Sequence, residues 1–175
     1  MPPSQQGLNG INLIRSFFRS NKNLKVLDVG GGDGRFSRLI RQYCSKIDTV
    51  EACGEYITNY NLKDLYDTVY HQDVLDFNWE GTSYDAVLLG DVLEHIDYSN
   101  AISLIKLLKE KVNYIFLSIP VTYCPQGATN GNIYEIHKYD WSDMEVRKTL
   151  GMNLQIFDLN ELAICCIATY YWSKK

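Results

Sequence analysis

A turn that contains four glycines joins an apolar strand to a helix near the start of the chain. The strand is predicted over residues 24–29 and carries Asp28, and four of the five residues at 30–34 are glycine. From Phe36 onward, apolar residues recur at helical spacing. Glycine lets the backbone turn sharply and approach a ligand, and the free N–H groups that begin the helix attract an anionic group. The segment therefore predicts the ligand-binding strand–turn–helix corner of an α/β protein.

The spacing of the glycines distinguishes two kinds of ligand-binding corner. A nicotinamide-binding turn reads Gly-x-Gly-x-x-Gly or Ala, and from Gly30 the last of these positions is Arg35. The observed pattern, Asp28-x-Gly30-x-Gly32-x-Gly34, resembles motif I of the class I S-adenosylmethionine-dependent methyltransferases. The resemblance implies that these four residues form part of a site for S-adenosylmethionine, which becomes S-adenosylhomocysteine when its methyl group is transferred.

Strands and helices alternate along most of the chain. The strands are predicted over 24–29, 47–52, 67–72, 84–89 and 112–119, and the helices over 35–44, 54–64, 98–111 and 140–150. Several strands are apolar throughout, as expected for a parallel sheet that is covered by helices on both faces. An earlier helix is predicted around residues 11–18 from its apolar face. The last helix has Asp140 as its predicted N-cap and ends at Gly151.

The end of the chain breaks this alternation. Residues 152–156 and 162–171 are predicted as strands joined by a turn near Asn160, with no helix between them, so they pair antiparallel or lie apart. A mostly parallel sheet that ends in such a hairpin is what the class I methyltransferases have. The resemblance covers residues 10–171. It implies an α/β fold, a Rossmann-like three-layer α/β/α sandwich whose seven-stranded sheet has the order 3-2-1-4-5-7-6, with strand 7 antiparallel.

Acidic residues follow the second and third strands. Glu51 lies 51 − 28 = 23 residues after Asp28, and a carboxylate there can accept both hydroxyl protons of a ribose; the alternative is a Glu that caps the next helix. After the third strand, the resemblance implies that Asp73 receives the amino group of the adenine and that the backbone N–H of Val74 meets the ring. Asp76 competes for this role, and Asp73 can also be an ordinary loop residue.

The fourth strand leads into residues 89–95, which read Leu-Gly-Asp-Val-Leu-Glu-His. The run resembles the small-molecule methyltransferases of the ubiquinone-biosynthesis-like type. The resemblance implies that Gly90 lets the backbone approach the methionine part of the cofactor and that Asp91 contacts its amino group or the substrate. Asp91 can instead cap a short helix. His95 is a candidate general base because imidazole titrates near neutral pH, although a lone histidine is more often structural, and Glu94 is predicted to be solvated.

A loop of about twenty residues without periodicity follows Pro120. It leaves the carboxyl edge of the predicted sheet, where ligands bind in open α/β folds. Related methyltransferases place a histidine before the final helix, and His137 matches it, which makes this residue a further catalytic candidate. Tyr123, Tyr134, His137 and Tyr139 either line a substrate pocket or only hold the loop in place.

The composition indicates a soluble globular protein. Of 175 residues, 46% are hydrophobic and 22% charged, and we assign residues 1–175 to one methyltransferase domain with a lead-in over 1–9. The net charge of −4 and the missing Asn/Asp-Pro-Pro-Tyr/Phe tetrapeptide argue against nucleic acid as a partner. No apolar run is long enough to span a membrane. The five cysteines form no CxxC pair and no metal-ligand spacing, so we expect reduced thiols, a cytoplasmic location and no metal centre.

These features predict an S-adenosylmethionine-dependent methyltransferase that acts on an oxygen or nitrogen of a small-molecule or carrier-linked acceptor. A second hypothesis is a catalytically silent module that keeps the cofactor fold for binding or scaffolding in a complex. A third, a nicotinamide-dependent enzyme, is disfavoured by Arg35 and by the antiparallel end of the chain. Because 175 residues are few for this family, the substrate is expected to be small and polar, presented by a protein partner, or enclosed by a second subunit of a homodimer.

Overall fold

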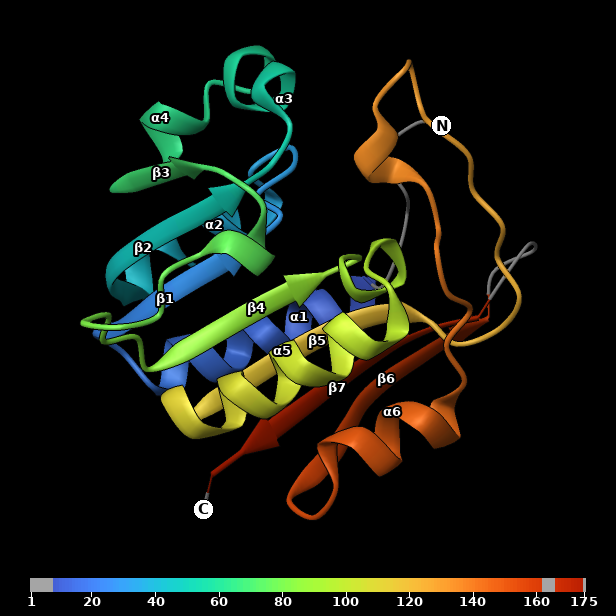
Figure 1. Ribbon diagram of the computed structural model, residues 1–175. Coiled ribbons are helices and arrows are strands. Elements are labelled where there is room, and N and C mark those ends of the chain that lie inside the picture. Colours follow the sequence, from blue (N-terminus) through green and yellow to red (C-terminus); the bar gives the residue numbers. More distant parts are fainter. Residues whose placement is uncertain (1–7, 162–165, 175) are drawn as a thin grey trace.

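A seven-stranded sheet forms the centre of the computed structural model, which describes residues 8–161 and 166–174. The strands lie in the order β3-β2-β1-β4-β5-β7-β6 (Figure 1). Their bounds are β1 Leu24–Val29, β2 Cys44–Glu51, β3 Thr68–His71, β4 Ala86–Gly90, β5 Tyr114–Pro120, β6 Leu154–Glu161 and β7 Cys166–Ser173. The strands β1 to β5 pair in parallel, and β7 runs antiparallel to both β5 and β6. The predicted fold class and strand order are confirmed.

Helices cover both faces of the sheet, which makes the three layers. The α-helices are α1 Leu8–Ser20, α2 Arg35–Ile40, α3 Gly54–Asn59, α4 Leu62–Leu65, α5 Tyr98–Lys111 and α6 Asp143–Leu150. Four short 3₁₀ helices are η1 Arg41–Tyr43, η2 Val74–Asp76, η3 Leu93–His95 and η4 Ile133–Glu135. Figure 1 shows α5 and α6 on one face of the sheet and α1 on the other. Among the described residues, no helix is both long and apolar enough to cross a membrane.

Two hydrophobic cores lie on the two faces of the sheet because successive strand residues point to opposite sides. Leu27 and Val29 belong to the core beneath α5 and α6, whereas Val26 belongs to the core beneath α1. In that second core, Phe17 and Phe18 of α1 pack edge-on or tilted against Phe116 of β5. Burial on both faces explains why these strands are apolar throughout.

Several predicted boundaries differ from the structure. The helix expected over 54–64 is split into α3 and α4 because Asn61 adopts a left-handed conformation with φ of 52°. The turn expected near Asn160 is wrong, since Asn160 pairs with Ile167 inside the β6–β7 ladder, and the residues that join these strands lie outside the described ones. Helix α1 takes in residues 8 and 9 of the predicted lead-in. Of the described cysteines, Cys53 is buried, and Cys44, Cys124 and Cys166 are half-buried.

The last helix begins later than predicted. Its N-cap is Ser142, and Asp140 lies two residues before it. The hydroxyl of Ser142 accepts the backbone N–H of Glu145, and the Glu145 carboxylate accepts the backbone N–H of Ser142 at 2.9 Å. This reciprocal capping box satisfies two N–H groups at once, whereas a lone Asp satisfies one.

Ser142→Ala should lower the free energy of unfolding by about 1 kcal/mol because the first turn of α6 loses its cap. Urea denaturation followed by circular dichroism measures the change. Ser103→Ala is the control, since Ser103 is exposed within α5 and its hydroxyl only donates to the carbonyl of Ser99. An equal loss in both variants would contradict the capping role.

Candidate functional site

The glycine turn lies at the carboxyl ends of the parallel strands, between β1 and α2. Three glycines of the turn have positive φ values: 71° at Gly30, 51° at Gly32 and 76° at Gly34. Residues that carry a side chain rarely adopt this backbone conformation. A Cβ at Gly34 would also lie 2.3 Å from Cδ1 of Leu65. The turn therefore needs glycine for its backbone conformation and for its close packing on α4.

Glu51 connects this turn to the end of β2. Only 5% of the residue is exposed. Its Oε2 accepts the N–H of Gly32 at 2.9 Å, and its Oε1 accepts the N–H of Cys53 at 2.8 Å. Burial raises the pKa of this carboxyl group, and the two N–H groups partly oppose the rise. Each oxygen keeps a lone pair for a further donor, so the carboxylate can still accept the hydroxyl groups of the predicted ribose contact.

Asp28 lies beneath the turn and is fully buried. The hydroxyl of Tyr66 donates to its Oδ2 at 2.5 Å, and its Oδ1 has no partner among the described residues. Burial raises the pKa of Asp28 to about 8, and the nearby carboxylate of Glu51 adds to the rise. The side chain therefore joins the end of β1, next to the glycine turn, to Tyr66.

The segment after β3 places the adenine candidates. Asp73 is half-buried and its Oδ1 accepts the N–H of Leu75 at 2.9 Å, which caps the 3₁₀ helix η2. Val74 is buried, whereas Asp76, the competing carboxylate, is exposed. Asp73 is therefore the more enclosed of the two acidic residues.

The end of β4 brings the backbone close to α2. A Cβ at Gly90 would lie 2.2 Å from Cε2 of Phe36, so this position admits no side chain without displacing the ring. Asp91 follows with a positive φ of 55°, and its Oδ1 is buried without a partner in the described part of the chain. Burial raises the pKa of Asp91 to about 6, and the charge of Arg35 opposes the rise. Asp91 does not cap η3, because Val92 occupies that position.

Glu94 differs most from its prediction. It was expected to be solvated, and this is wrong: 2% of the residue is exposed. Neither carboxylate oxygen has a hydrogen-bond partner among the described residues. Burial raises the pKa of Glu94 well above its ordinary value, and the nearby Asp91 raises it further.

The loop over 121–142 covers this edge of the sheet (Figure 1). Its backbone is fixed to η3, because the N–H groups of Lys138 and Tyr139 donate to the carbonyl of Glu94 at 2.7 and 3.2 Å. At its far side, Glu135 accepts the hydroxyl of Tyr56 from α3 at 2.8 Å. The loop thus spans the site from β4 to α3.

The loop brings the two candidate histidines together. The ring centroids of His95 and His137 lie 4.9 Å apart. Of the predicted pocket tyrosines, Tyr123 and Tyr134 are exposed, whereas Tyr139 packs against Tyr98 of α5 at 4.5 Å between ring centroids. The aromatic residues of the loop therefore divide between surface positions and a packing role.

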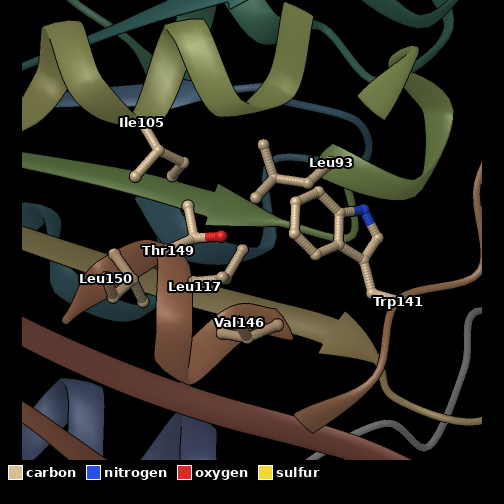
Figure 2. A pocket seen from close by; sticks show the side chains of 7 residues that line it. All are labelled: Leu93, Ile105, Leu117, Trp141, Val146, Thr149 and Leu150. Carbon is tan, nitrogen blue, oxygen red and sulfur yellow. The ribbon is translucent and has the colours of Figure 1, made fainter. Parts of the chain in front are cut away.

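A separate apolar pocket lies behind η3 (Figure 2). It is too small to hold a water molecule and is lined by Leu93, Ile105, Leu117, Trp141, Val146, Thr149 and Leu150. Six of these seven side chains carry no hydroxyl or charge. They lie at or beside the interface that α5 and α6 form with the sheet. The pocket is a packing gap of the core, and the polar site lies at the edge of the sheet.

Comparison with known proteins agrees with this geometry. The sequence profile of the methyltransferase domain matches residues 8–165. The chain belongs to the methyltransferase domain family. A search of curated proteins found no significant match.

Several solved structures share the fold of this chain. The N-terminal domain of EvdMO1 with S-adenosylhomocysteine bound has 14% identity and a TM-score of 0.73, covering 98% of this chain and 85% of that one. Magnesium protoporphyrin IX methyltransferase from Synechocystis PCC 6803 with bound S-adenosylmethionine has 20% identity and a TM-score of 0.65, covering 93% and 78%. TehB from Haemophilus influenzae has 18% identity and a TM-score of 0.72, covering 94% and 62%.

The buried state of Asp28 should make stability depend on pH. With its folded pKa raised from 3.8 to about 8, the folded protein binds more protons than the unfolded chain between these values. This contribution to the unfolding free energy is therefore present below about pH 4 and lost as the pH rises toward 8. Asp28→Asn removes the titration, so the stability of the variant relative to wild type should rise over that range.

Thermal or urea unfolding at pH 4 to 8 measures this difference. Asp64→Asn, at an exposed position of α4, is the control for loss of a carboxylate. A difference between Asp28→Asn and wild type that stays constant with pH would show that Asp28 ionises normally in the folded state.

Proposed function

We propose that this methyltransferase-family chain transfers the methyl group of S-adenosylmethionine to an oxygen or nitrogen of a small polar or carrier-linked acceptor. The observation that carries the proposal is the buried carboxylate of Glu51, held between the glycine turn and the start of α3. The structural neighbours with S-adenosylmethionine or S-adenosylhomocysteine bound support the choice of cofactor.

The adenosine end of the cofactor fits the edge formed by β1, β2 and β3. We assign the two ribose hydroxyls to the Glu51 carboxylate, whose oxygens keep lone pairs for them. Asp73 accepts the amino group of the adenine, and the backbone N–H of Val74 faces the ring. Two of the glycines, Gly30 and Gly32, form the floor of this site.

The methionine end fits the edge formed by β4 and the glycine turn. Its amino group is cationic, and the buried Oδ1 of Asp91 lacks a partner among the described residues. A cationic amino group satisfies that oxygen and offsets the cost of burying a carboxylate. Gly90 and Gly34 let the backbone at this edge pack closely on Phe36 and Leu65. Asp28 positions the turn through its contact with Tyr66.

The chemistry follows from what the cofactor and the side chains each supply. When bound, S-adenosylmethionine supplies a methyl group on a sulfonium that is already activated. The chain orients the acceptor, excludes water with the loop over 121–142, and takes up the acceptor proton. Burial lowers the pKa of His95, which keeps this imidazole neutral at pH 7 and able to accept a proton. His137, beside it, orients the acceptor.

The charge of the site favours a small polar acceptor. Asp91, Glu94 and Glu135 interact electrostatically with one another, and Glu135 also interacts with His95. Such a negative edge disfavours nucleic acid, in agreement with the net charge of −4. A cationic or neutral hydroxyl- or amine-bearing acceptor suits it best.

Glu51→Ala should weaken binding of S-adenosylhomocysteine by about 1–3 kcal/mol, because two buried hydroxyls lose their acceptor. Isothermal titration calorimetry with S-adenosylmethionine and S-adenosylhomocysteine measures the loss. Glu80→Ala, at an exposed position, is the matched control and should bind like wild type. Absence of binding in the wild type would sink the proposal, whereas binding without methyl transfer to any acceptor would favour a silent binding module.

Asp91→Asn should separate the two ends of the cofactor. It should weaken binding of S-adenosylhomocysteine by about 1.5–3 kcal/mol, because a hydrogen bond between charged groups is lost. Adenosine, which has no methionine part, should bind the variant and the wild type equally. A parallel loss for both ligands in the same titration would mean that Asp91 acts on the fold of the site and not on the amino group.

A further inference from the structure

The carboxylate of Glu94 is buried without a partner from any other described residue. Only 2% of the residue is exposed, and Oε1 and Oε2 both lack a hydrogen-bond partner within residues 8–161 and 166–174. Lys138, the lysine of the loop over 121–142, forms its ion pair with Asp97, at 3.7 Å between Nζ and Oδ2. Buried charges in proteins are paired or bind metals, so this carboxylate is chemically incomplete as it stands.

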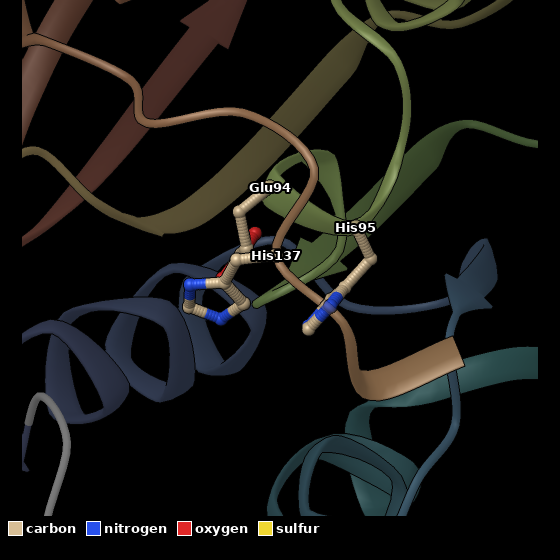
Figure 3. A group of neighbouring side chains, drawn as sticks. All are labelled: Glu94, His95 and His137. Carbon is tan, nitrogen blue, oxygen red and sulfur yellow. The ribbon is translucent and has the colours of Figure 1, made fainter. Parts of the chain in front are cut away.

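Two imidazole rings lie beside this carboxylate. Glu94, His95 and His137 each offer a ligand atom, and these atoms all lie within 4.8 Å of one another. Figure 3 shows the three side chains gathered from η3 and from the loop that passes it. The loop is held there by the two N–H groups, of Lys138 and Tyr139, that donate to the Glu94 carbonyl.

Hydrogen bonds fix the tautomer of both rings. Nδ1 of His95 lies 3.2 Å from the carbonyl oxygen of Ile136, and Nδ1 of His137 bonds to the carbonyl oxygen of Cys124. Since a carbonyl only accepts, Nδ1 is the donor in each ring, and Nε2 of the neutral ring keeps its lone pair. Histidines that bind metals commonly donate their other ring N–H to a backbone carbonyl in this way.

We propose that Glu94, His95 and His137 bind one divalent cation, through the carboxylate and the Nε2 atom of each imidazole. Three protein ligands leave a further coordination position open to water or to an acceptor. Two imidazoles and one carboxylate suit Zn²⁺ and neighbouring transition ions such as Co²⁺ and Mn²⁺, whereas Mg²⁺ and Ca²⁺ prefer ligand sets made of oxygen alone.

The spacing of the side chains is compatible with such an ion after a small adjustment. Bonds of about 2.0–2.2 Å to a tetrahedral ion place its ligand atoms about 3.3 Å apart. The ligand atoms lie within 4.8 Å of one another, so binding requires the two half-buried histidines to move slightly closer to Glu94. Glu94 stays in place because it is packed in the core.

The ion would act on the loop and on the acceptor. It would join the loop over 121–142 to the end of β4, and its open position can hold a hydroxyl oxygen and lower the pKa of that hydroxyl. With the ion bound, Nε2 of His95 is a ligand, so the ion takes the place of this imidazole in promoting loss of the acceptor proton. Activation of the methyl group needs no metal, because the sulfonium is activated already. The role toward an acceptor rests on the proposed function, whereas cation binding by itself does not.

Calorimetric titration of the full chain with Zn²⁺, after chelator treatment and without an affinity tag, tests the site. We expect one equivalent to bind, and Co²⁺ in its place to give the visible absorption of a low-symmetry site. Loss of a residue that only hydrogen-bonds to a metal ligand typically costs 10–100-fold in metal affinity. Glu94→Gln and His137→Gln remove direct ligands, so each should weaken binding by about 100-fold or more. His71→Gln, at an exposed position, is the matched control and should bind like wild type.

Thermal unfolding gives a second readout that does not depend on activity. Zn²⁺ should raise the unfolding temperature of the wild type and leave that of Glu94→Gln unchanged, because only a folded site binds the ion. No saturable binding near one equivalent, or equal binding by all variants, would overturn the proposal. Titration of the same samples with S-adenosylhomocysteine separates the cation-site proposal from the cofactor proposal. Zn²⁺ can bind when S-adenosylhomocysteine does not, and the reverse is also possible.

Discussion

The hydrogen bonds of the Glu51 carboxylate hold the site together. One oxygen accepts from the glycine turn after β1 and the other from Cys53 at the start of α3, so a single side chain aligns two βα corners. The glycine turn can take this position only because three of its residues adopt positive φ. The cofactor proposal depends on that alignment, since it sets the edge along which the adenosine part would lie.

The loop over 121–142 completes this edge from the other side. Its contacts reach η3 through the carbonyl of Glu94 and α3 through Tyr56. At this edge, Oδ1 of Asp91 and both carboxylate oxygens of Glu94 are buried without partners among the described residues. Their burial is costly for the free chain, and it is the arrangement expected where a cationic group of a ligand or an ion supplies the missing partner.

The sheet could be predicted from sequence because its signals are local. Apolar runs predicted the parallel strands, and the lack of a helical pattern between the last two strands predicted the antiparallel end of the sheet. The N-cap of α6 was wrongly predicted at Asp140, although Glu145 three residues after Ser142 is a capping-box signal for the observed start. Two features of the site could not be predicted from sequence: the burial of Glu94 and the contact of Glu135 with Tyr56, 79 residues away. Both depend on how a long loop without periodicity folds back over the sheet.

A crystal structure of the full chain grown with S-adenosylhomocysteine is the most direct test of the central claim. The account predicts the ligand at the carboxyl edge of the sheet, with both ribose hydroxyls within 3.2 Å of the Glu51 carboxylate, inside ordinary hydrogen-bond range. It also predicts the amino group beside Asp91. A ligand bound elsewhere, or a Glu51 side chain that makes no contact with the ribose, would contradict the account.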